Sequence, residues 1–570
     1  MIAPPVTPQW TLNGRRDAER SRALAEALQA PWPVGAALIN RGVDQPEAAR
    51  RFLEPSLEDL HDPFLLRDLD LATARLQSAI ERGERILVHG DYDVDGITST
   101  FLLYSVLTDL GARVEYRIPH RTRDGYGLSL DAIDEARRRG CTLVVTVDCG
   151  ITAVESVARA RSLGIDTVIT DHHEPPALLP DAVALVNPHR EGCRYPFKSL
   201  AGVGVTFKVV EALLRGRGGL ERARAHLDVV ALGTIADVVP LVGENRVLAR
   251  LGLERLNRGE RLGLRALIDA AGLAGKRITS GQIAFVLAPR INAAGRMGNP
   301  EQGVRLLLSR DSSEAQAIAA SLEDDNLRRR RFDEGALVQA AERVERELGW
   351  PDCASILLWS DEWHPGVIGI VASRLVERFQ RPTVLVALDG ERGRGSGRSL
   401  PGLDLNRLLN DCGDLLEAYG GHAFAAGLTV QRDRLPELRE RFERLVRDRL
   451  SPDDCVPRLV LDGDLHLSEC TLELVDWLER MSPHGLDNPE PLFRARDVVV
   501  ESAAAVGGGK HLRLVLRDGT GRAEGIGFGL GAQAASVAQA GRCDVAFVPT
   551  RNEWMGETRI QLKVKGVKIP

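Results

Sequence analysis

The sequence predicts an α/β protein of several domains: a parallel-sheet domain, a helical connector, a second α/β domain and a carboxyl-terminal β-barrel. Its 570 residues are too many for one hydrophobic core. Short apolar runs alternate with amphipathic stretches over residues 76–245 and again over 349–450, and this alternation is typical of a parallel sheet covered by helices. Short strand-like runs between glycine turns fill residues 451–570.

Composition limits the classes of protein to consider. Hydrophobic residues make up 44% of the chain and charged residues 27%, which is ordinary for a soluble globular protein. None of the eight cysteines forms a Cys-x-x-Cys pair, so neither a zinc ribbon nor a disulfide framework is expected. Without a signal-like segment or a long apolar run, the sequence predicts a cytoplasmic protein with no membrane span. A net charge of −6 disfavours a wholly basic nucleic-acid coat but allows a local basic groove.

Residues 1–75 are predicted to form an amino-terminal appendage that packs on the rest of the chain. Helical character is found in Arg16–Gln29 and Pro46–Phe52. No catalytic side chains cluster in this region, so it offers no chemistry.

The first predicted strand, Ile86–Val88, leads into the acidic segment Asp91-Tyr-Asp-Val-Asp-Gly96. Alternate residues of an extended chain share a face, so the three carboxylates are expected to crowd one patch. Crowded carboxylates raise one another's pKa, and a divalent cation relieves their repulsion. A solvated acidic turn explains this segment equally well when it is taken alone.

The next segments of the chain repeat the strand–helix pattern. Helices are predicted at Leu71–Arg82, Ile97–Leu110, Leu130–Arg139 and Ile151–Leu163, and strands at Val114–Ile118, Leu143–Val147, Thr167–Ile169 and Val183–Val186. Two of these strands are followed by side chains that can bind a metal or transfer a proton, Asp148 and Asp171-His-His173. Ligands bind at the carboxyl ends of parallel strands. Three strand ends rich in Asp or His therefore favour a metal site over a solvated turn.

The side chains available to such a site are Asp93, Asp95, Asp148 and His172, a mixture that Mn²⁺ accepts. Asp237 lies inside the apolar segment Ala231–Leu241, where an unpaired charge is costly. It is either a cap of a helix or strand or a further metal ligand, and the second interpretation is favoured. His173 cannot point the same way as His172 and is expected to face the substrate, as a phosphate ligand or an acid/base group.

Four motifs together, Asp-Tyr-Asp-Val-Asp-Gly, Val-Asp-Cys-Gly, Thr-Asp-His-His and Ala-Asp-Val-Val-Pro-Leu, resemble those of the DHH phosphoesterase superfamily, and within it the RecJ family of single-strand-specific 5′→3′ DNA exonucleases. The resemblance implies two divalent ions, Mn²⁺ or Mg²⁺, held by Asp93, Asp95, Asp148, His172 and Asp237. It makes Asp148, as the bridging carboxylate, and His173 the catalytic candidates. His89 and Asp91 occupy positions whose role differs among superfamily members, so we rank them lower as ligands.

Two segments combine cations with small or aromatic residues. Arg121, Arg123 and Tyr126 could pair with phosphates and stack on a base, or form a surface loop with an aromatic plug. Arg290 and Arg296 flank a small-residue loop that resembles the segment closing over the substrate in RecJ proteins. This makes them candidates for the 5′ phosphate, and the alternative is a tight connection between helices.

Residues 246–348 are expected to form the helical connector, which ends in a long helix over Ser312–Leu348. Arg328–Arg331 lies inside this helix and is interpreted as a solvated face. In the second α/β domain, strands are predicted at Ala354–Trp359 and Thr383–Ala387. Two later glycine-rich segments resemble the DHH-associated domain, which implies that Arg394, Ser396, Arg398, Ser399 and His422 grip the nucleic-acid backbone. A glycine-rich hairpin loop would explain the glycines but not His422.

The last 120 residues are predicted to form a small β-barrel. Strands are expected at Arg458–Leu461, Val498–Ser502, Leu512–Leu516, Cys543–Val548 and Ile560–Val564. Residues 501–570 contain ten Lys or Arg against six Asp or Glu, a basic surplus in an acidic chain. A basic barrel beside a nuclease site suggests an OB-fold that holds single strands.

The leading functional hypothesis is a metal-dependent exodeoxyribonuclease that degrades single-stranded DNA 5′→3′ to 5′-mononucleotides, in DNA recombination and repair. The resemblance implies a bacterial monomer whose partners are single-stranded DNA, a single-strand-binding protein and a RecQ-type helicase. One alternative is hydrolysis of a small phosphate such as a nanoRNA, a cyclic dinucleotide or pyrophosphate, but smaller superfamily members lack the connector and the barrel. A catalytically dead scaffold would require a broken motif, and none is broken.

Overall fold

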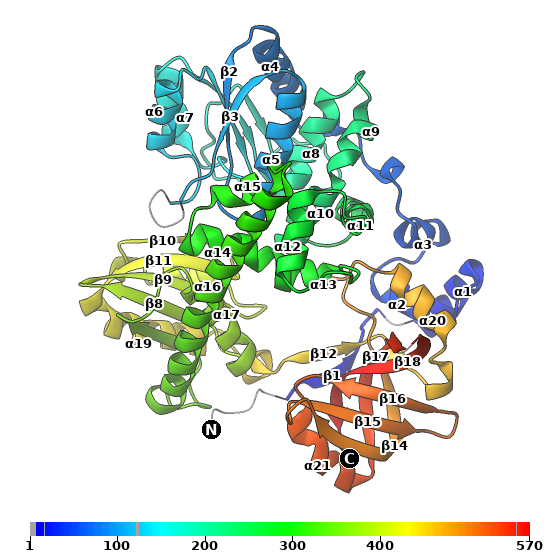
Figure 1. Cartoon of the computed structure of the whole chain (residues 1–570). Coiled ribbons are helices and arrows are strands. Elements are labelled where there is room, and N and C mark those ends of the chain that lie inside the picture. The colour runs from blue at the N-terminus through cyan, green and yellow to red at the C-terminus, as the bar shows by residue number, and fades with distance from the viewer. Residues whose placement is uncertain (1–6, 16, 121–124, 555, 570) are drawn as a thin grey trace.

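The computed structural model describes residues 7–15, 17–120, 125–554 and 556–569. Figure 1 shows the predicted order of parts, with the parallel-sheet domain at the top, the helical connector in the centre, the second α/β domain at the lower left and the barrel at the lower right. The predicted fold class is confirmed. No helix in the described part of the chain is long and apolar enough to cross a membrane.

The first domain contains a five-stranded parallel sheet in the order β3-β2-β4-β5-β6. Its strands are β2 (Arg85–His89), β3 (Arg113–Arg117), β4 (Leu143–Val147), β5 (Asp166–Thr170) and β6 (Ala184–Val186). Successive side chains of a strand point to opposite faces, and accordingly Val145 joins one apolar cluster while Val144 joins another. Helices α4 (Leu69–Glu81), α5 (Val94–Asp109) and α8 (Gly202–Leu213) cover the first face, and α6 (Leu130–Arg138) and α7 (Val154–Ser162) the second.

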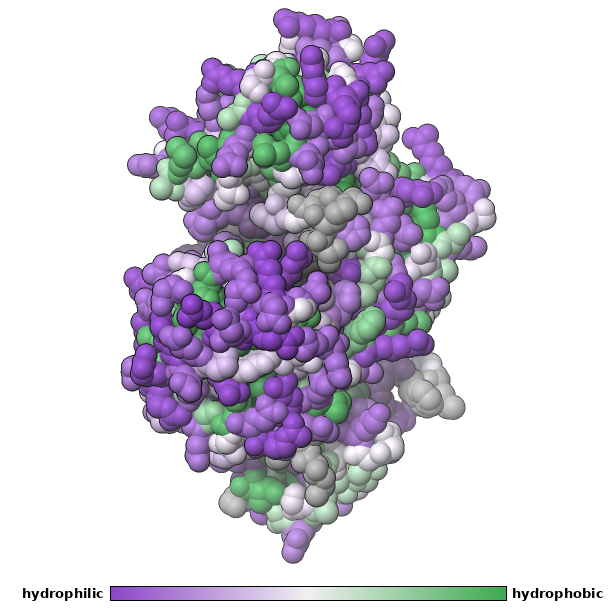
Figure 2. All heavy atoms as spheres, turned by 90° about the vertical axis from the view of Figure 1, so that its left-hand side faces the viewer, coloured by the Kyte–Doolittle hydropathy of each residue, from purple (hydrophilic) through white to green (hydrophobic). Residues whose placement is uncertain are grey.

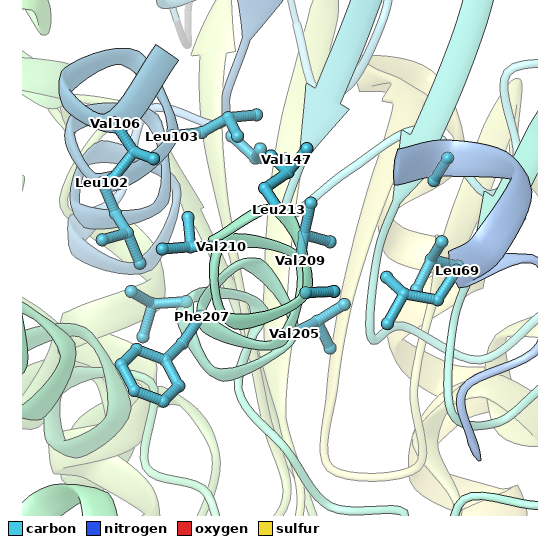
Figure 3. Close-up of a cluster of buried hydrophobic side chains, with 14 of the residues drawn as sticks. Leu69, Leu102, Leu103, Val106, Val147, Val205, Phe207, Val209, Val210 and Leu213 are labelled. Atoms are coloured by element: carbon cyan, nitrogen blue, oxygen red, sulfur yellow. The ribbon is translucent and has the colours of Figure 1, made fainter. Parts of the chain in front are cut away.

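The larger of these two cores fixes the helices that carry the acidic motifs. Leu102 of α5 and Val210 of α8 lie between the two helices (Figure 3), and Leu103, Val106 and Val209 belong to the same core. Because both helices are fully packed here, their amino-terminal turns are held rigidly at the carboxyl edge of the sheet.

The connector is helical, as predicted. Helices α9 (Gly219–Ala223) and α10 (Leu227–Ala236) precede it. The connector contains α11 (Gly243–Leu256), α12 (Leu262–Ala270), α13 (Ser280–Gln282), the π-helical turn η4 (Ile283–Leu287), α14 (Ala288–Met297), α15 (Glu301–Leu308) and α16 (Ser312–Glu347). The predicted bridging helix is α16: Leu322 packs in the connector core and Ala340 in the core of the second domain. The prediction that Arg328–Arg331 is a solvated face is wrong at Arg329, which is buried and donates to Asn326 Oδ1 at 2.7 Å.

The second α/β domain has a mixed sheet in the order β10-β11-β9-β8-β7. Its strands are β7 (Ile356–Ser360), β8 (Thr383–Asp389), β9 (Arg392–Arg398), β10 (Ala418–Gly421) and β11 (Ala425–Gln431), and α17 (Ile368–Phe379) and α19 (Leu435–Arg447) pack on opposite faces. Of the two glycine-rich segments, Arg394–Arg398 lies within β9, whereas residues 420–427 form the ends of β10 and β11 and the hairpin turn between them, which contains His422. Gly395 suits this position because a methyl group there would lie 2.6 Å from a methyl of Leu428 on the neighbouring strand.

In the barrel, β14 (Phe493–Val506), β15 (His511–Arg517), β16 (Arg522–Gly527), β18 (Glu557–Lys568) and β17 (Arg542–Trp554) close through pairing of β14 with β17. Strand β16 was not predicted from the sequence. At the other end of the chain, β1 (Gln9–Leu12) pairs with β12 (Arg458–Leu461). Helices α1 (Ala18–Leu28), α2 (Trp32–Asn40) and α3 (Pro46–Leu53) share one apolar core with the barrel and α20 (Leu472–Arg480). The two ends of the chain therefore form one structural unit (Figure 1).

Candidate metal centre and substrate cleft

The first acidic motif lies in the turn from β2 to α5. Asp93 caps the helix by accepting the Gly96 N–H at 3.1 Å, and Asp95 lies in its first turn. The expected extended geometry, with alternate carboxylates on one face, is therefore wrong. The acids converge because the chain turns tightly here, with Gly96 packed against the backbone of Asp91.

Three sets of side chains bring metal-ligating atoms within 4.8 Å of one another: Asp91, Asp93 and Asp148; Asp95, His172 and Asp237; and Asp148, His172 and His173. All five ligands implied by the resemblance are thus brought together at the carboxyl edge of the sheet. The structure places Asp91 with them, although its sequence position alone ranked it lower. His89 lies in none of these sets; it is buried, with Nε2 3.2 Å from the Gly127 carbonyl oxygen.

The centre contains buried polar atoms that a cation would satisfy. His172 Nε2 lies 3.1 Å from Asp148 Oδ1, 3.7 Å from Asp237 Oδ2 and 3.8 Å from Asp95 Oδ2. Neither His172 Nε2 nor Asp148 Oδ1 has a hydrogen-bond partner among the described residues. Buried polar atoms are normally paired, so these two fit a bound ion. Four clustered carboxylates with one imidazole suit Mn²⁺ or Mg²⁺.

The ligands differ in how the protein supports them. Both oxygens of Asp95 accept amide hydrogens at the start of α8, from Gly202 at 2.7 Å and Val203 at 2.8 Å. Asp237 instead terminates α10 as its C-cap. Its carboxylate also belongs to the set with Asp95 and His172, so the position at the helix end is compatible with either interpretation of Asp237.

The pKa values of the clustered carboxylates indicate a site for a cation. Burial, reinforced by the charge of Asp93, raises the pKa of Asp95 to about 7. Burial and the neighbouring carboxylates also raise the pKa values of Asp148 and Asp237 well above the ordinary range. Burial lowers the pKa of His172 to about 4, so its ring is neutral and has a lone pair to offer. Without a cation, this cluster would hold extra protons at neutral pH.

A second group, built around His173, lies beside the ligands. Asp171 is fully buried and accepts from His173 Nδ1 at 2.7 Å and from the Ile151 N–H at 2.9 Å. Burial would lower the pKa of His173, but the hydrogen bond and charge of Asp171 outweigh it and raise that pKa. Asp171 had no predicted role, although its place before two histidines at a strand end was a usable signal.

His173 also meets residues from elsewhere in the chain. The Tyr126 hydroxyl lies 3.1 Å from its Nδ1. The His422 ring of the second domain stacks at 6.4 Å between centroids, with planes 15° apart. The predicted substrate residues Tyr126 and His422 therefore both lie beside His173, one from the first domain and the other from the second. Figure 2 shows a hollow between these two parts of the molecule.

The other predicted substrate residues are placed differently. Arg121 and Arg123 lie outside the described residues. Arg290 is buried in an ion pair with Glu323 at 2.5 Å, which favours a role in holding α14 on α16. Arg296 donates to the Gly366 carbonyl oxygen at 2.6 Å.

On β9, Arg394, Ser396 and Arg398 alternate and so share one face of the strand. Ser396 and Arg398 lie beside the start of α17, where a methyl group at Gly369 would be 2.8 Å from Ser396 Oγ. Ser399 Oγ donates to the Leu403 carbonyl oxygen at 2.8 Å.

Comparison with known proteins gives three domain matches: the DHH family N-terminal domain over residues 85–234, the DHHA1 domain over 353–448 and the RecJ OB domain over 461–566. The chain is similar to the single-stranded-DNA-specific exonuclease RecJ of Bacillus subtilis (strain 168), with 38% identity over 98% of this chain and 71% of that protein. It is 36% identical to the corresponding protein of Escherichia coli (strain K12), over 96% of this chain and 98% of that one.

Two solved structures of RecJ are similar to this chain over nearly its whole length. The structure of RecJ in complex with Mn²⁺ from Thermus thermophilus superimposes with a TM-score of 0.85 at 32% identity, covering 99% of this chain and 80% of that chain. The Mg²⁺ complex of the same protein gives a TM-score of 0.78 over 99% and 78% of the two chains.

Proposed function

The chain belongs to the RecJ family of DHH phosphoesterases, and on that basis we propose that it is a metal-dependent exonuclease that hydrolyses single-stranded DNA from the 5′ end to 5′-mononucleotides. The observation that carries this proposal is the juxtaposition of the carboxylate–histidine cluster with His173 and His422, which face each other across the cleft. A phosphodiester placed there would meet cations, an acid/base group and the second domain at once.

The ligand side chains would supply the metal chemistry of the reaction. Asp93, Asp95, Asp148, His172 and Asp237 would hold two divalent ions, which when bound activate water and neutralise phosphate charge. Asp148 and His172 each belong to two of the three ligand sets, and Asp148 is the proposed ligand of both ions because a carboxylate offers two oxygens.

His173 is the proposed acid/base group. Its raised pKa keeps the ring protonated over a wider pH range, and Asp171 fixes the ring so that it can donate to a phosphate oxygen. Tyr126 limits the movement of the same ring. His173 is thus held ready before substrate arrives.

On the substrate side, the residues proposed to hold the backbone are Arg394, Ser396, Arg398, Ser399 and His422, and the candidates for the 5′ phosphate are Arg290 and Arg296. Arg290 is the weakest of these candidates because its charge is already paired. By analogy with the family, we also propose a role in recombination and repair in the bacterial cytoplasm, as a monomer that meets a single-strand-binding protein and a RecQ-type helicase.

Polarity tests the proposal most directly. A single strand labelled separately at each end would be incubated with Mn²⁺, and the order in which the labels are released would be followed. We expect the 5′ label to leave first, as a mononucleotide. Loss from the 3′ end would refute the proposal, and faster turnover of a dinucleotide than of a long strand would favour a small-phosphate hydrolase.

A further inference from the structure

The solvent-facing side of α16 carries a stripe of residues that the metal centre does not use. Arg328, Arg331, Phe332 and Gly335 are three or four positions apart and so share one face of the helix. Phe332 is 44% exposed, and the Arg328 side chain is 59% exposed. A large exposed aromatic ring between arginines is unusual on a helix whose opposite face is already buried.

The charges of this stripe are largely uncompensated. Within the described chain, Arg331 has no carboxylate within 4.0 Å, even though Glu334 is only three residues away. Arg328 lies 3.7 Å from its only ion-pair partner in the described residues, Asp325. The barrel differs: there Arg542 pairs with Asp497 at 2.6 Å. An exposed arginine with no carboxylate in reach, beside a second arginine whose ion pair is long, suits a polyanion.

A second ring extends Phe332 into a platform. The His364 ring lies 5.4 Å from it between centroids, with a tilt of 31°. His364 Nδ1 accepts the Gly366 N–H at 3.0 Å, so the ring proton is on Nε2. Burial and the charge of Arg328 lower the pKa of His364, which keeps this ring neutral. Nucleobases stack on adjacent aromatic faces of this kind beside cations.

The platform is connected to both walls of the cleft. The loop that begins with His364 leads into α17, where a methyl group at Gly369 would lie 2.8 Å from Ser396 Oγ and 3.1 Å from a guanidinium nitrogen of Arg398 on β9. Gly366 in the same loop accepts from Arg296 of α14. One turn earlier on α14, Asn292 Oδ1 accepts the Val94 N–H at 3.1 Å, directly after Asp93. Asn292 and Arg296 are about 6 Å apart along the helix axis, so the platform lies within a few nucleotides of the metal ligands.

We propose that this stripe is a guide for single-stranded DNA on the 3′ side of the cleavage point, with bases stacking on Phe332 and His364 and phosphates pairing with Arg328 and Arg331. Gly335 fits this role: a methyl group there would meet no atom within 4 Å, so the glycine leaves the helix surface open to a backbone. The inference rests on the proposed nuclease activity and deepens it by naming where the undigested strand lies.

The test compares short and long substrates in the Phe332→Ala and Arg331→Ala variants. On a strand of about 30 nucleotides, well beyond a site of ~4–16, we expect Phe332→Ala to raise KM about 5- to 100-fold with kcat unchanged. A trinucleotide, too short to reach the platform, should be cleaved as by the wild type. Arg331→Ala should lower the salt dependence of log KM by about 0.7 for each phosphate that the variant no longer neutralises.

Controls separate stacking from folding. Phe332→Trp should restore KM, because any large ring can stack, and Arg346→Ala, an exposed arginine at the far end of the same helix, should leave the salt dependence unchanged. A fluorescent base analogue moved along the strand should be quenched at one position in the wild type but not in Phe332→Ala. Unchanged KM and unchanged fluorescence in Phe332→Ala would overturn the guide. Equal losses on both substrate lengths would overturn it as well. If the wild type failed to cleave any strand, the proposed function would fail instead.

Discussion

Gly202→Ala is the substitution whose effect can be worked out most directly from the geometry of the metal centre. A methyl group at this position would lie 2.6 Å from the carboxyl carbon and 2.7 Å from the Cβ of Asp148. Carbon atoms pack at about 3.5–4.0 Å, so the carboxylate or the start of α8 must move by roughly 1 Å. Such a shift would also disturb the Gly202 N–H that holds Asp95 at 2.7 Å. A misplacement of ~1 Å costs about 100-fold in rate, or ~2.7 kcal/mol of transition-state stabilisation.

The assay is steady-state cleavage of single-stranded DNA at increasing Mn²⁺, with thermal unfolding measured in parallel. Gly204→Ala is the matched control: it lies on the same helix two residues away, and its methyl would meet the side chain of Leu200, with the nearest methyl at 3.2 Å and Cβ at 3.5 Å. Replacing Gly by Ala favours the helix by up to ~1 kcal/mol at either position. Any loss of activity that is specific to Gly202→Ala is therefore due to the contact with Asp148 and not to weaker helix formation. If Gly202→Ala kept activity within about threefold of the wild type, the placement of Asp148 against α8 would be wrong.

The same site and two buried histidines give three further predictions. Asp148→Ala should abolish turnover and weaken Mn²⁺ binding in calorimetry, yet leave strand binding largely intact; full activity would refute the two-metal assignment. Asp171→Asn should lower kcat ~10²- to 10⁴-fold and lower the pKa of His173 in NMR titration, and an unchanged titration would remove Asp171 from the mechanism. Burial depresses the pKa values of His226 and His484 from 6.5 to about 4, so protons bind more tightly to the unfolded chain. Their contribution to stability is therefore complete above pH 6.5 and lost as pH falls toward 4. The melting temperature should fall over this range, and a flat profile would contradict the burial of these rings.

Local patterns were enough to predict most elements, whereas contacts between distant segments were not. The strand Leu143–Val147 was predicted with the bounds that β4 has, because a fully buried strand is a continuous apolar run with clear ends. The strand β9 was missed because its alternate glycines carry no hydrophobic signal; their role is to make room for side chains of β8 and β11. Nothing local in Gln9–Leu12 indicates that its partner strand begins at Arg458.

The candidate ligands lie together for a reason that differs in part from the predicted one. Their clustering was expected from an extended chain, but Asp95 belongs to a helix and reaches the site because α5 begins within the motif. A helical first turn still brings the acids together, since consecutive residues there lie close in space. Asp171 was not assigned because a buried acid that orients a histidine has the same local sequence as one that binds a metal.

The helix termini explain why the site combines acids of different character. Asp95 lies at the amino terminus of α8, whose amides and positive dipole end stabilise a carboxylate without any ion. Asp237 lies at the carboxyl terminus of α10, where the dipole is unfavourable for an anion. The causes of the pKa shifts agree with this difference: burial has the larger effect on the pKa of Asp95, but the amides of Val203 and Gly202 lower that pKa, whereas burial and the neighbouring carboxylates raise the pKa of Asp237 well above its ordinary value. The ionised form of Asp237 therefore depends on a bound cation, whereas the ionised form of Asp95 is already stabilised in part by the amides of α8. Metal binding and ionisation of the site are in this way one coupled event.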